Sequence, residues 1–107
     1  MSLSEKSCVP CRGDVPPLPP EEVQALLSEL PNWSLVDGHL YRRFDFPDFA
    51  SALALLNQIG ALAEVEGHHP DLLLAWGRLE VTIYTHAIQG LTESDFVLAA
   101  KIDRLSR

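Results

Sequence analysis

Residues 72–86 read LLLAWGRLEVTIYTH, and this stretch decides the fold. Over residues 79–85 one face carries Leu, Val, Ile and Thr while the other carries Glu, Thr and Tyr, which is the period of a strand with one buried face. Gly77-Arg78 separates this run from the apolar run over residues 72–76. The sequence therefore predicts two antiparallel strands over residues 72–76 and 79–85, with His86 at the end of the second.

A second hairpin is expected nearer the N-terminus. Residues 33–36 and 40–46 are strand-like runs joined by Asp37-Gly38. This dipeptide readily takes the positive φ angles that a two-residue hairpin turn requires. The chain therefore supplies four strands, paired as two hairpins.

Three helices are expected around these hairpins. Residues 21–30 carry apolar side chains at positions i, i+3, i+4 and i+7, which predicts a short amphipathic helix. Pro47-Asp48 opens a second helix that runs to about Glu64, and Thr92-Glu93-Ser94-Asp95 has the spacing of a capping box that opens the third. The order α-β-β-α-β-β-α predicts an α+β fold, in which a four-stranded antiparallel sheet has its helices packed on one face.

Length and composition favour one acidic domain. The chain has 107 residues, of which 47% are apolar, and this is enough for a single core. We place that domain at residues 21–107, after a proline-rich, extended and flexible leader over residues 1–20. The formal charge of −7 disfavours nucleic acid as a partner. Because we find no signal-peptide pattern and no apolar run long enough to cross a bilayer, we expect a cytoplasmic protein without membrane association.

The second helix predicts self-association. Between Asp48 and Glu64 the sequence contains no charged residue, and apolar side chains lie on more than one side of the expected helix. The sheet can cover only one of these sides. We therefore expect a homodimer or a homotetramer.

The two cysteines, Cys8 and Cys11, form a Cys-Val-Pro-Cys pair in the leader. Such a pair can be a redox site or half of a zinc site. A redox pair normally opens a helix after a strand, and a zinc site needs a second pair of ligands. Neither context is present, so we interpret the pair as reduced thiols without a special function.

Three histidines form the most informative cluster in the sequence. His68 and His69 follow the second helix and precede Pro70, and His86 ends the last expected strand. Imidazole both gives and takes a proton near neutral pH, although a solvated histidine pair in a loop is also common. Neighbours in an extended segment point to opposite sides, so we expect His68 and His69 to have different roles. Glu64 sits unfavourably for the helix dipole, which suggests that it orients a histidine.

Around these histidines, the sequence resembles the pterin-4a-carbinolamine dehydratases over residues 21–105. The resemblance rests on Glu64-Val-Glu-Gly-His68-His69-Pro70, followed by Trp76, Thr85-His86, Gly90-Leu91-Thr92 and Asp95. A doubled histidine with proline and a second Thr-His at a fixed distance is more specific than any single element. The fold of that family, an antiparallel four-stranded sheet with helices on one side, is similar to the order predicted above.

The resemblance implies a hydro-lyase that dehydrates 4a-hydroxytetrahydropterin to quinonoid dihydropterin in tetrahydropterin recycling. It implies no metal and no cofactor, because the pterin is the substrate, and it places the protein in the same pathway as an aromatic amino acid hydroxylase. His68 and His86 would be the acid/base pair, with His69 holding the pterin and Glu64 hydrogen-bonding to the histidines. The implied substrate-binding residues are His68, His69, Pro70, Thr85, His86, Ala87 and Ile88.

Two positions, Gly67 and Leu72, depart from the residues that are common in that family. Gly67 stands where some relatives carry an acidic residue, and Leu72 stands where an aromatic often follows the proline, so a polar contact and a stacking contact are expected to be lost. For Asp95 the capping box is a sufficient explanation. Two alternatives stand beside the acid/base enzyme, namely a two-His-one-carboxylate metal site and a binding module resembling a transcriptional cofactor, without enzymatic activity.

Overall fold

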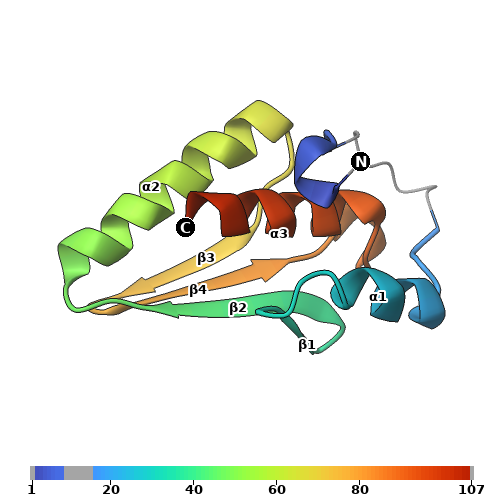
Figure 1. Cartoon of the computed structure of the whole chain (residues 1–107), viewed down its shortest axis with the longest axis horizontal. Coiled ribbons are helices and arrows are strands. Elements are labelled where there is room, and N and C mark those ends of the chain that lie inside the picture. Colours follow the sequence, from blue (N-terminus) through green and yellow to red (C-terminus); the bar gives the residue numbers. More distant parts are fainter. Residues whose placement is uncertain (1, 9–15, 107) are drawn as a thin grey trace.

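Four strands form one antiparallel sheet in the order β1-β2-β4-β3, with helices above it (Figure 1). The computed structural model describes residues 2–8 and 16–106. Its helices and strands are α1 (Pro20–Leu27), β1 (Ser34–Val36), β2 (His39–Asp45), α2 (Phe49–Glu66), β3 (Asp71–Ala75), β4 (Arg78–Ile83) and α3 (Glu93–Leu105). Short 3-10 helices lie at Leu3–Glu5 and His86–Ile88. The predicted order of elements is confirmed.

Strand β4 is the centre of the sheet because it pairs with both β2 and β3. Leu40 of β2 lies opposite Ile83, and Leu72 of β3 lies opposite Val81. The apolar side chains of β4 are fully buried, whereas the residues between them face away from the core. The alternation read from the sequence is therefore the burial pattern of the strand.

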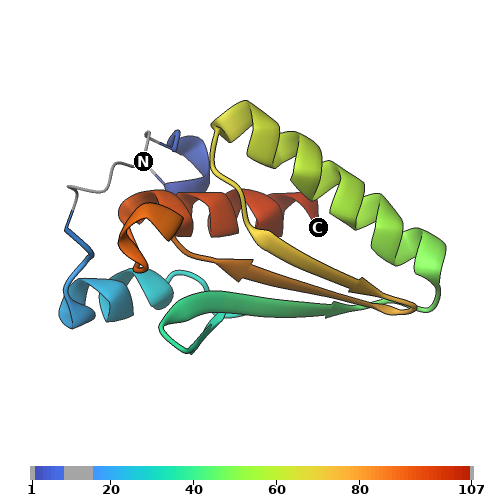
Figure 2. The ribbon, with the colours of Figure 1, turned by 180° about the vertical axis from the view of Figure 1, so that it is seen from behind.

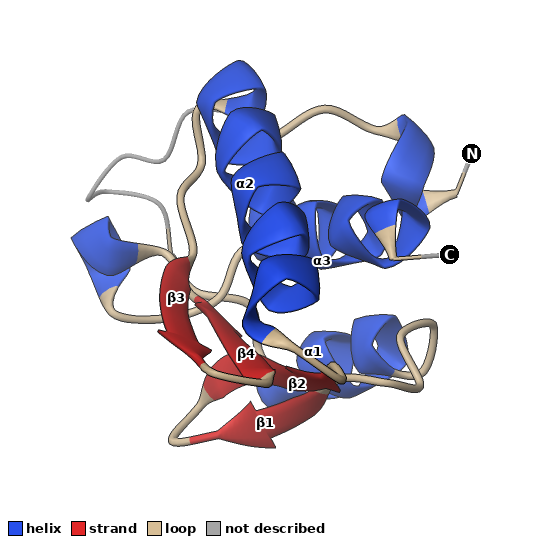
Figure 3. Cartoon of the chain, turned by 90° about the vertical axis from the view of Figure 1, so that its left-hand side faces the viewer, coloured by secondary structure: helices blue, strands red, loops and turns tan. Residues whose placement is uncertain are grey.

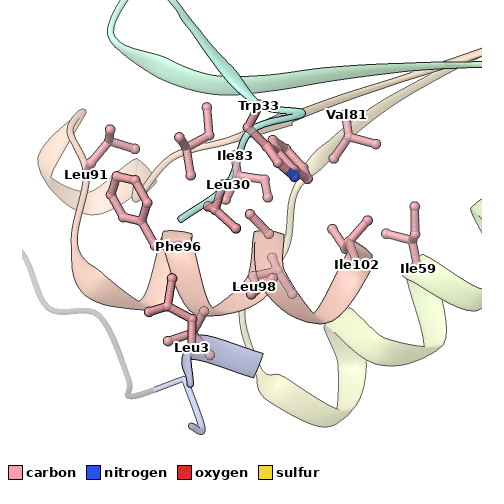
Figure 4. Close-up of a cluster of buried hydrophobic side chains, with 14 of the residues drawn as sticks. Leu3, Leu30, Trp33, Ile59, Val81, Ile83, Leu91, Phe96, Leu98 and Ile102 are labelled. Carbon is pink, nitrogen blue, oxygen red and sulfur yellow. The ribbon is translucent and has the colours of Figure 1, made fainter. Parts of the chain in front are cut away.

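Helices α2 and α3 lie across one face of the sheet, as Figure 3 shows from the side. Between the layers, Ile59 of α2 and Phe96 and Ile102 of α3 meet Val81 and Ile83 of β4 (Figure 4). All five of these side chains are almost completely buried. The predicted α+β class, with helices on one face, is confirmed.

The end of β4 differs from the sequence-based prediction. The strand ends at Ile83, because Thr85 exchanges backbone hydrogen bonds with Gly90 instead of continuing the ladder with β2 and β3. The loop so closed contains the 3-10 helix His86–Ile88 and ends at Gln89, which has a positive φ of 51°. The placement of His86 at the end of a strand was therefore wrong, since His86 opens a 3-10 turn.

Other boundaries shift by a few residues. Helix α1 ends at Leu27 rather than residue 30, because the amides of Glu29 and Leu30 bond three residues back in tight turns. Helix α2 continues through Glu66, two residues beyond the prediction. Along its outer side Phe49, Leu53 and Val65 are exposed. Among the described residues, no helix is both long and apolar enough to span a membrane.

The first residues of the chain are not extended as predicted. Residues 3–5 form a 3-10 helix that packs against α3 (Figure 2), and Leu3 is only 5% exposed because it packs into the core. Burial of Leu3, the ion pair between Lys6 and Glu93 and the contacts of Cys8 together dock this segment. Residues 9–15, including Cys11, lie outside the described residues.

Cys8 contacts the end of α2 and the start of α3. Its backbone N–H donates to Glu66 Oε1 at 3.0 Å, and its thiol donates to the carbonyl of Ser94 at 3.5 Å. Burial, followed by the nearby Glu66 carboxylate, raises the pKa of the Cys8 thiol to about 12. A thiol with so high a pKa is a poor nucleophile near neutral pH.

Gly67 ends α2 in the left-handed conformation, with φ of 65°. Its amide closes the helix on the carbonyl of Ala63. We expect Gly67→Ala to lower the free energy of unfolding by about 1 kcal/mol, through backbone strain, because a Cβ there would meet no neighbouring atom. Urea unfolding measures the change. The matched control is Gly60→Ala within α2, which should raise stability by about 0.5–1 kcal/mol, and equal effects of the two substitutions would contradict the prediction.

The raised pKa of Cys8 predicts slow alkylation. In a Cys11→Ser variant, iodoacetamide at pH 8 should modify Cys8 far more slowly in the folded protein than in urea, where the pKa returns to roughly 8.5. The sign follows because a higher pKa leaves less thiolate at a given pH. Mass spectrometry of timed samples gives both rates, and equal rates would show that Cys8 is not protected.

Candidate active site

Three elements bring the predicted site residues together at one end of the sheet. The end of α2, the loop after β4 and the start of α3 meet there, as Figure 1 shows. Between them lies a cleft of about 200 Å³, lined by Gly67, His68, His69, Thr85, His86 and Ala87. Of the predicted substrate-binding residues, Pro70 and Ile88 are not among those that line this cleft.

His68 turns inward and is only 7% exposed. Its Nε2 lies 2.6 Å from Oδ1 of Asp95. Because a carboxylate oxygen only accepts, the ring nitrogen donates this hydrogen bond. In the neutral imidazole the proton then sits on Nε2 and the lone pair on Nδ1, so that Asp95 selects the tautomer of His68.

Asp95 is fully buried and joins the three elements of the site. In addition to His68, it accepts hydrogen bonds through Oδ2 from the hydroxyl of Thr85 and from the backbone N–H of Thr92, both at 2.8 Å. These donors compensate for the removal of a carboxylate from water. The capping role predicted for Asp95 is therefore present. It does not account for the whole function of this side chain, which also accepts a hydrogen bond from His68.

His69 points the other way and pairs with Glu64 at the surface. Its Nε2 hydrogen-bonds to Oε2 of Glu64, which lies in the last turn of α2. Both side chains are mostly exposed. The expected contact between Glu64 and a histidine is thus observed, and the two neighbouring histidines do face different surroundings.

His86 has a carboxylate neighbour that the sequence analysis missed. Its Nε2 lies 3.5 Å from Oδ1 of Asp71, the first residue of β3, and its side chain is 54% exposed. The ring also contacts that of Tyr84, with centroids 4.2 Å apart. The signal was available in principle, because a hairpin register that pairs Asp71 with Thr82 places β3's first residue near the end of β4.

The three histidines therefore have three different carboxylate partners. His68 pairs with Asp95, His69 with Glu64 and His86 with Asp71. Within residues 2–8 and 16–106, no three His, Cys, Asp or Glu side chains are arranged so that they could hold a metal ion. This arrangement suits proton transfer, because each imidazole can change its charge beside a negative group.

Two solved structures are similar in fold to this chain. A crystal structure from Brucella melitensis, described as a transcriptional coactivator/pterin dehydratase, matches with a TM-score of 0.80 and 33% identity, over 86% of this chain and 100% of that one. A second structure, described as a pterin dehydratase-like protein that is a RuBisCO assembly factor in the alpha-carboxysome, matches with a TM-score of 0.58 and 27% identity, over 69% of this chain and 86% of that one.

Sequence comparisons extend to nearly the whole chain. A protein of Rubrobacter xylanophilus is 57% identical over 96% of this chain and 97% of its own, and one of Rickettsia bellii is 58% identical over 97% and 94%. Both are provisionally named pterin-4-alpha-carbinolamine dehydratases. The family described as pterin 4 alpha carbinolamine dehydratase matches residues 16–105. The predicted family and hydro-lyase class are confirmed, and the chain belongs to the pterin 4 alpha carbinolamine dehydratase family.

Proposed function

We propose that this protein removes water from 4a-hydroxytetrahydropterin and forms quinonoid dihydropterin. The observation that carries the proposal is the cleft at the end of the sheet, where His68, His69 and His86 converge and each has its own carboxylate. Membership of a dehydratase family makes the pterin carbinolamine the substrate that this cleft would take.

The reaction needs two proton transfers. The bond between C4a and its hydroxyl oxygen breaks, and that oxygen leaves as water once it has received a proton. The neighbouring ring nitrogen, N5, loses its proton as the C=N bond forms. General acid/base catalysis of this kind contributes roughly a hundredfold to ten-thousandfold to a rate. Histidines suit both steps near neutral pH.

We assign the base to His68 and the acid to His86. His68 is held by the buried carboxylate of Asp95, which fixes the tautomer and stabilises the imidazolium that forms when the ring takes up a proton. His86 lies at the exposed rim beside Asp71, where its imidazole lines the cleft and can deliver a proton to the leaving hydroxyl. His69, oriented by Glu64, would hold the pterin at the opposite wall.

The same assignment extends to the pathway, the cofactor requirement and the oligomeric state of the protein. Tetrahydropterin recycling would place the enzyme after an aromatic amino acid hydroxylase, and catalysis in this form needs no added cofactor. The exposed apolar side chains along α2, Phe49, Leu53 and Val65, support a homodimer or homotetramer. A cytoplasmic location, the use of Thr85, Ala87, Pro70 and Ile88 in substrate binding, and the extent of the domain at residues 21–107 stay predictions.

A partner-binding role is the second candidate. The Brucella melitensis structure is described as a transcriptional coactivator as well as a pterin dehydratase. The same exposed apolar side chains of α2 could bind such a partner. The two roles are compatible, because the histidine cleft lies beyond the end of this helix.

We expect His68→Ala and His86→Ala each to lower kcat by at least about a hundredfold, because each would remove a proton-transfer group. His69→Ala should instead act mainly on KM. Stopped-flow measurement of the ultraviolet signal of the 4a-hydroxypterin gives both constants. Asn32→Ala, in an exposed turn before β1, is the control and should behave like the wild type. Dehydration at the wild-type rate by the His68 or His86 variant would refute the assignment.

Asp95→Asn should weaken both the fold and the reaction. An amide offers one acceptor oxygen to the three donors of His68, Thr85 and Thr92, so we expect the free energy of unfolding to fall by about 1–3 kcal/mol. The rate should fall as well, because the tautomer of His68 is no longer fixed. Urea unfolding and the stopped-flow assay test these effects. Glu93→Gln, an exposed carboxylate in the same turn, should change stability by less than about 0.5 kcal/mol. Similar losses in both variants would contradict the role of Asp95.

A further inference from the structure

Three aromatic rings form a row at the site end of the sheet. His39, at the start of β2, stacks on Tyr84 with centroids 3.8 Å apart and planes 6° from parallel. Tyr84 in turn contacts His86, with centroids 4.2 Å apart and planes inclined by 42°. The row therefore leads from the start of β2 directly to a histidine of the cleft.

The sheet register places these rings side by side. Leu40 lies opposite Ile83, so the next residues outward, His39 and Tyr84, also face each other across the two strands. Since Leu40 and Ile83 are buried on the helix side, alternation directs the next side chains to the outer face of the sheet. His39 and Tyr84 thus lie on two adjacent segments, the start of β2 and the residue after β4, whereas His86 lies in the loop that follows.

His86 itself has little else that could fix its ring. Its side chain is 54% exposed, it lies on a 3-10 turn after the end of β4, and its ion pair with Asp71 is long at 3.5 Å. An exposed ion pair of this length restrains a side chain weakly. The ring of Tyr84 is the closely packed surface against His86.

We propose that Tyr84, supported by His39, is a positioning residue that holds the imidazole of His86 toward the cleft. The inference rests on the proposed function, in which His86 donates a proton to the leaving hydroxyl. A proton donor must stay within hydrogen-bond reach of the atom that it protonates, so a ring that restricts His86 to one orientation acts on kcat. Tyr84 does not itself transfer a proton in this scheme.

The test compares Tyr84→Leu with variants that keep a ring. In Tyr84→Leu we expect kcat to fall about threefold to tenfold, the size of one aromatic contact, with little change in KM. Tyr84→Phe and His39→Phe retain the stack and should stay near the wild-type rate. Tyr41→Leu is the matched control, because Tyr41 lies on the same face of β2 and donates its hydroxyl to Glu80 outside the row.

A second readout does not depend on activity. The ring of Tyr84 should shift the imidazole proton resonances of His86 upfield in the wild-type NMR spectrum, and Tyr84→Leu should abolish that shift while Tyr41→Leu preserves it. Unchanged His86 resonances in Tyr84→Leu would overturn the proposal, as would an equal loss of kcat in Tyr41→Leu. If the wild-type protein dehydrates no pterin, the proposed function fails, and the NMR comparison still decides whether Tyr84 orients His86.

Discussion

The buried carboxylate of Asp95 is the constraint on which the rest of this site depends. It accepts hydrogen bonds from His68 after α2, from Thr85 after β4 and from the first amide of the α3 cap at Thr92. A carboxylate without access to water requires all of these donors, since a lost partner leaves a charge uncompensated. Because the donors come from three elements, satisfying one side chain fixes the relative positions of those elements, and the cleft is formed where they meet.

This constraint also separates the three histidines. His68 is buried and held at a single orientation, whereas His69 and His86 stand at the rim with the exposed carboxylates of Glu64 and Asp71. A buried imidazole keeps its orientation, but it exchanges protons with solvent slowly unless a bound substrate relays them. An exposed imidazole can take up a proton from solvent after each turnover. One fixed and one exposed proton-transfer group therefore suit a reaction that takes one proton from the substrate, returns one to it and releases water.

The fold could be predicted from sequence because the spacing of apolar residues within each helix and strand indicates its type. The alternation in β4 and the turn residues at Asp37-Gly38 are local signals. Glu64 was predicted as a histidine partner, but the partners of His68 and His86 could not be found from local periodicity, because Asp95 and Asp71 are distant in sequence from them. The docking of Leu3 was missed for a related reason, since a single apolar residue carries no period. The loop after β4 was extended into a strand because the burial alternation continues through Thr85 although its ladder hydrogen bonds go to Gly90.

The two departures noted in the sequence have different structural meanings. Gly67 adopts a left-handed conformation that terminates α2, so an acidic residue there would add charge beside His68 at the expense of backbone strain. Leu72 is partly buried and packs against the hydrophobic core, and it is not one of the residues that line the cleft. The loss of a stacking contact with substrate at this position stays a prediction. Tyr84, the residue that follows β4, is instead an aromatic side chain that contacts a histidine of the cleft. In the proposed arrangement, the ring of Tyr84 rather than the side chain at residue 72 sets the position of His86 at the rim of the cleft.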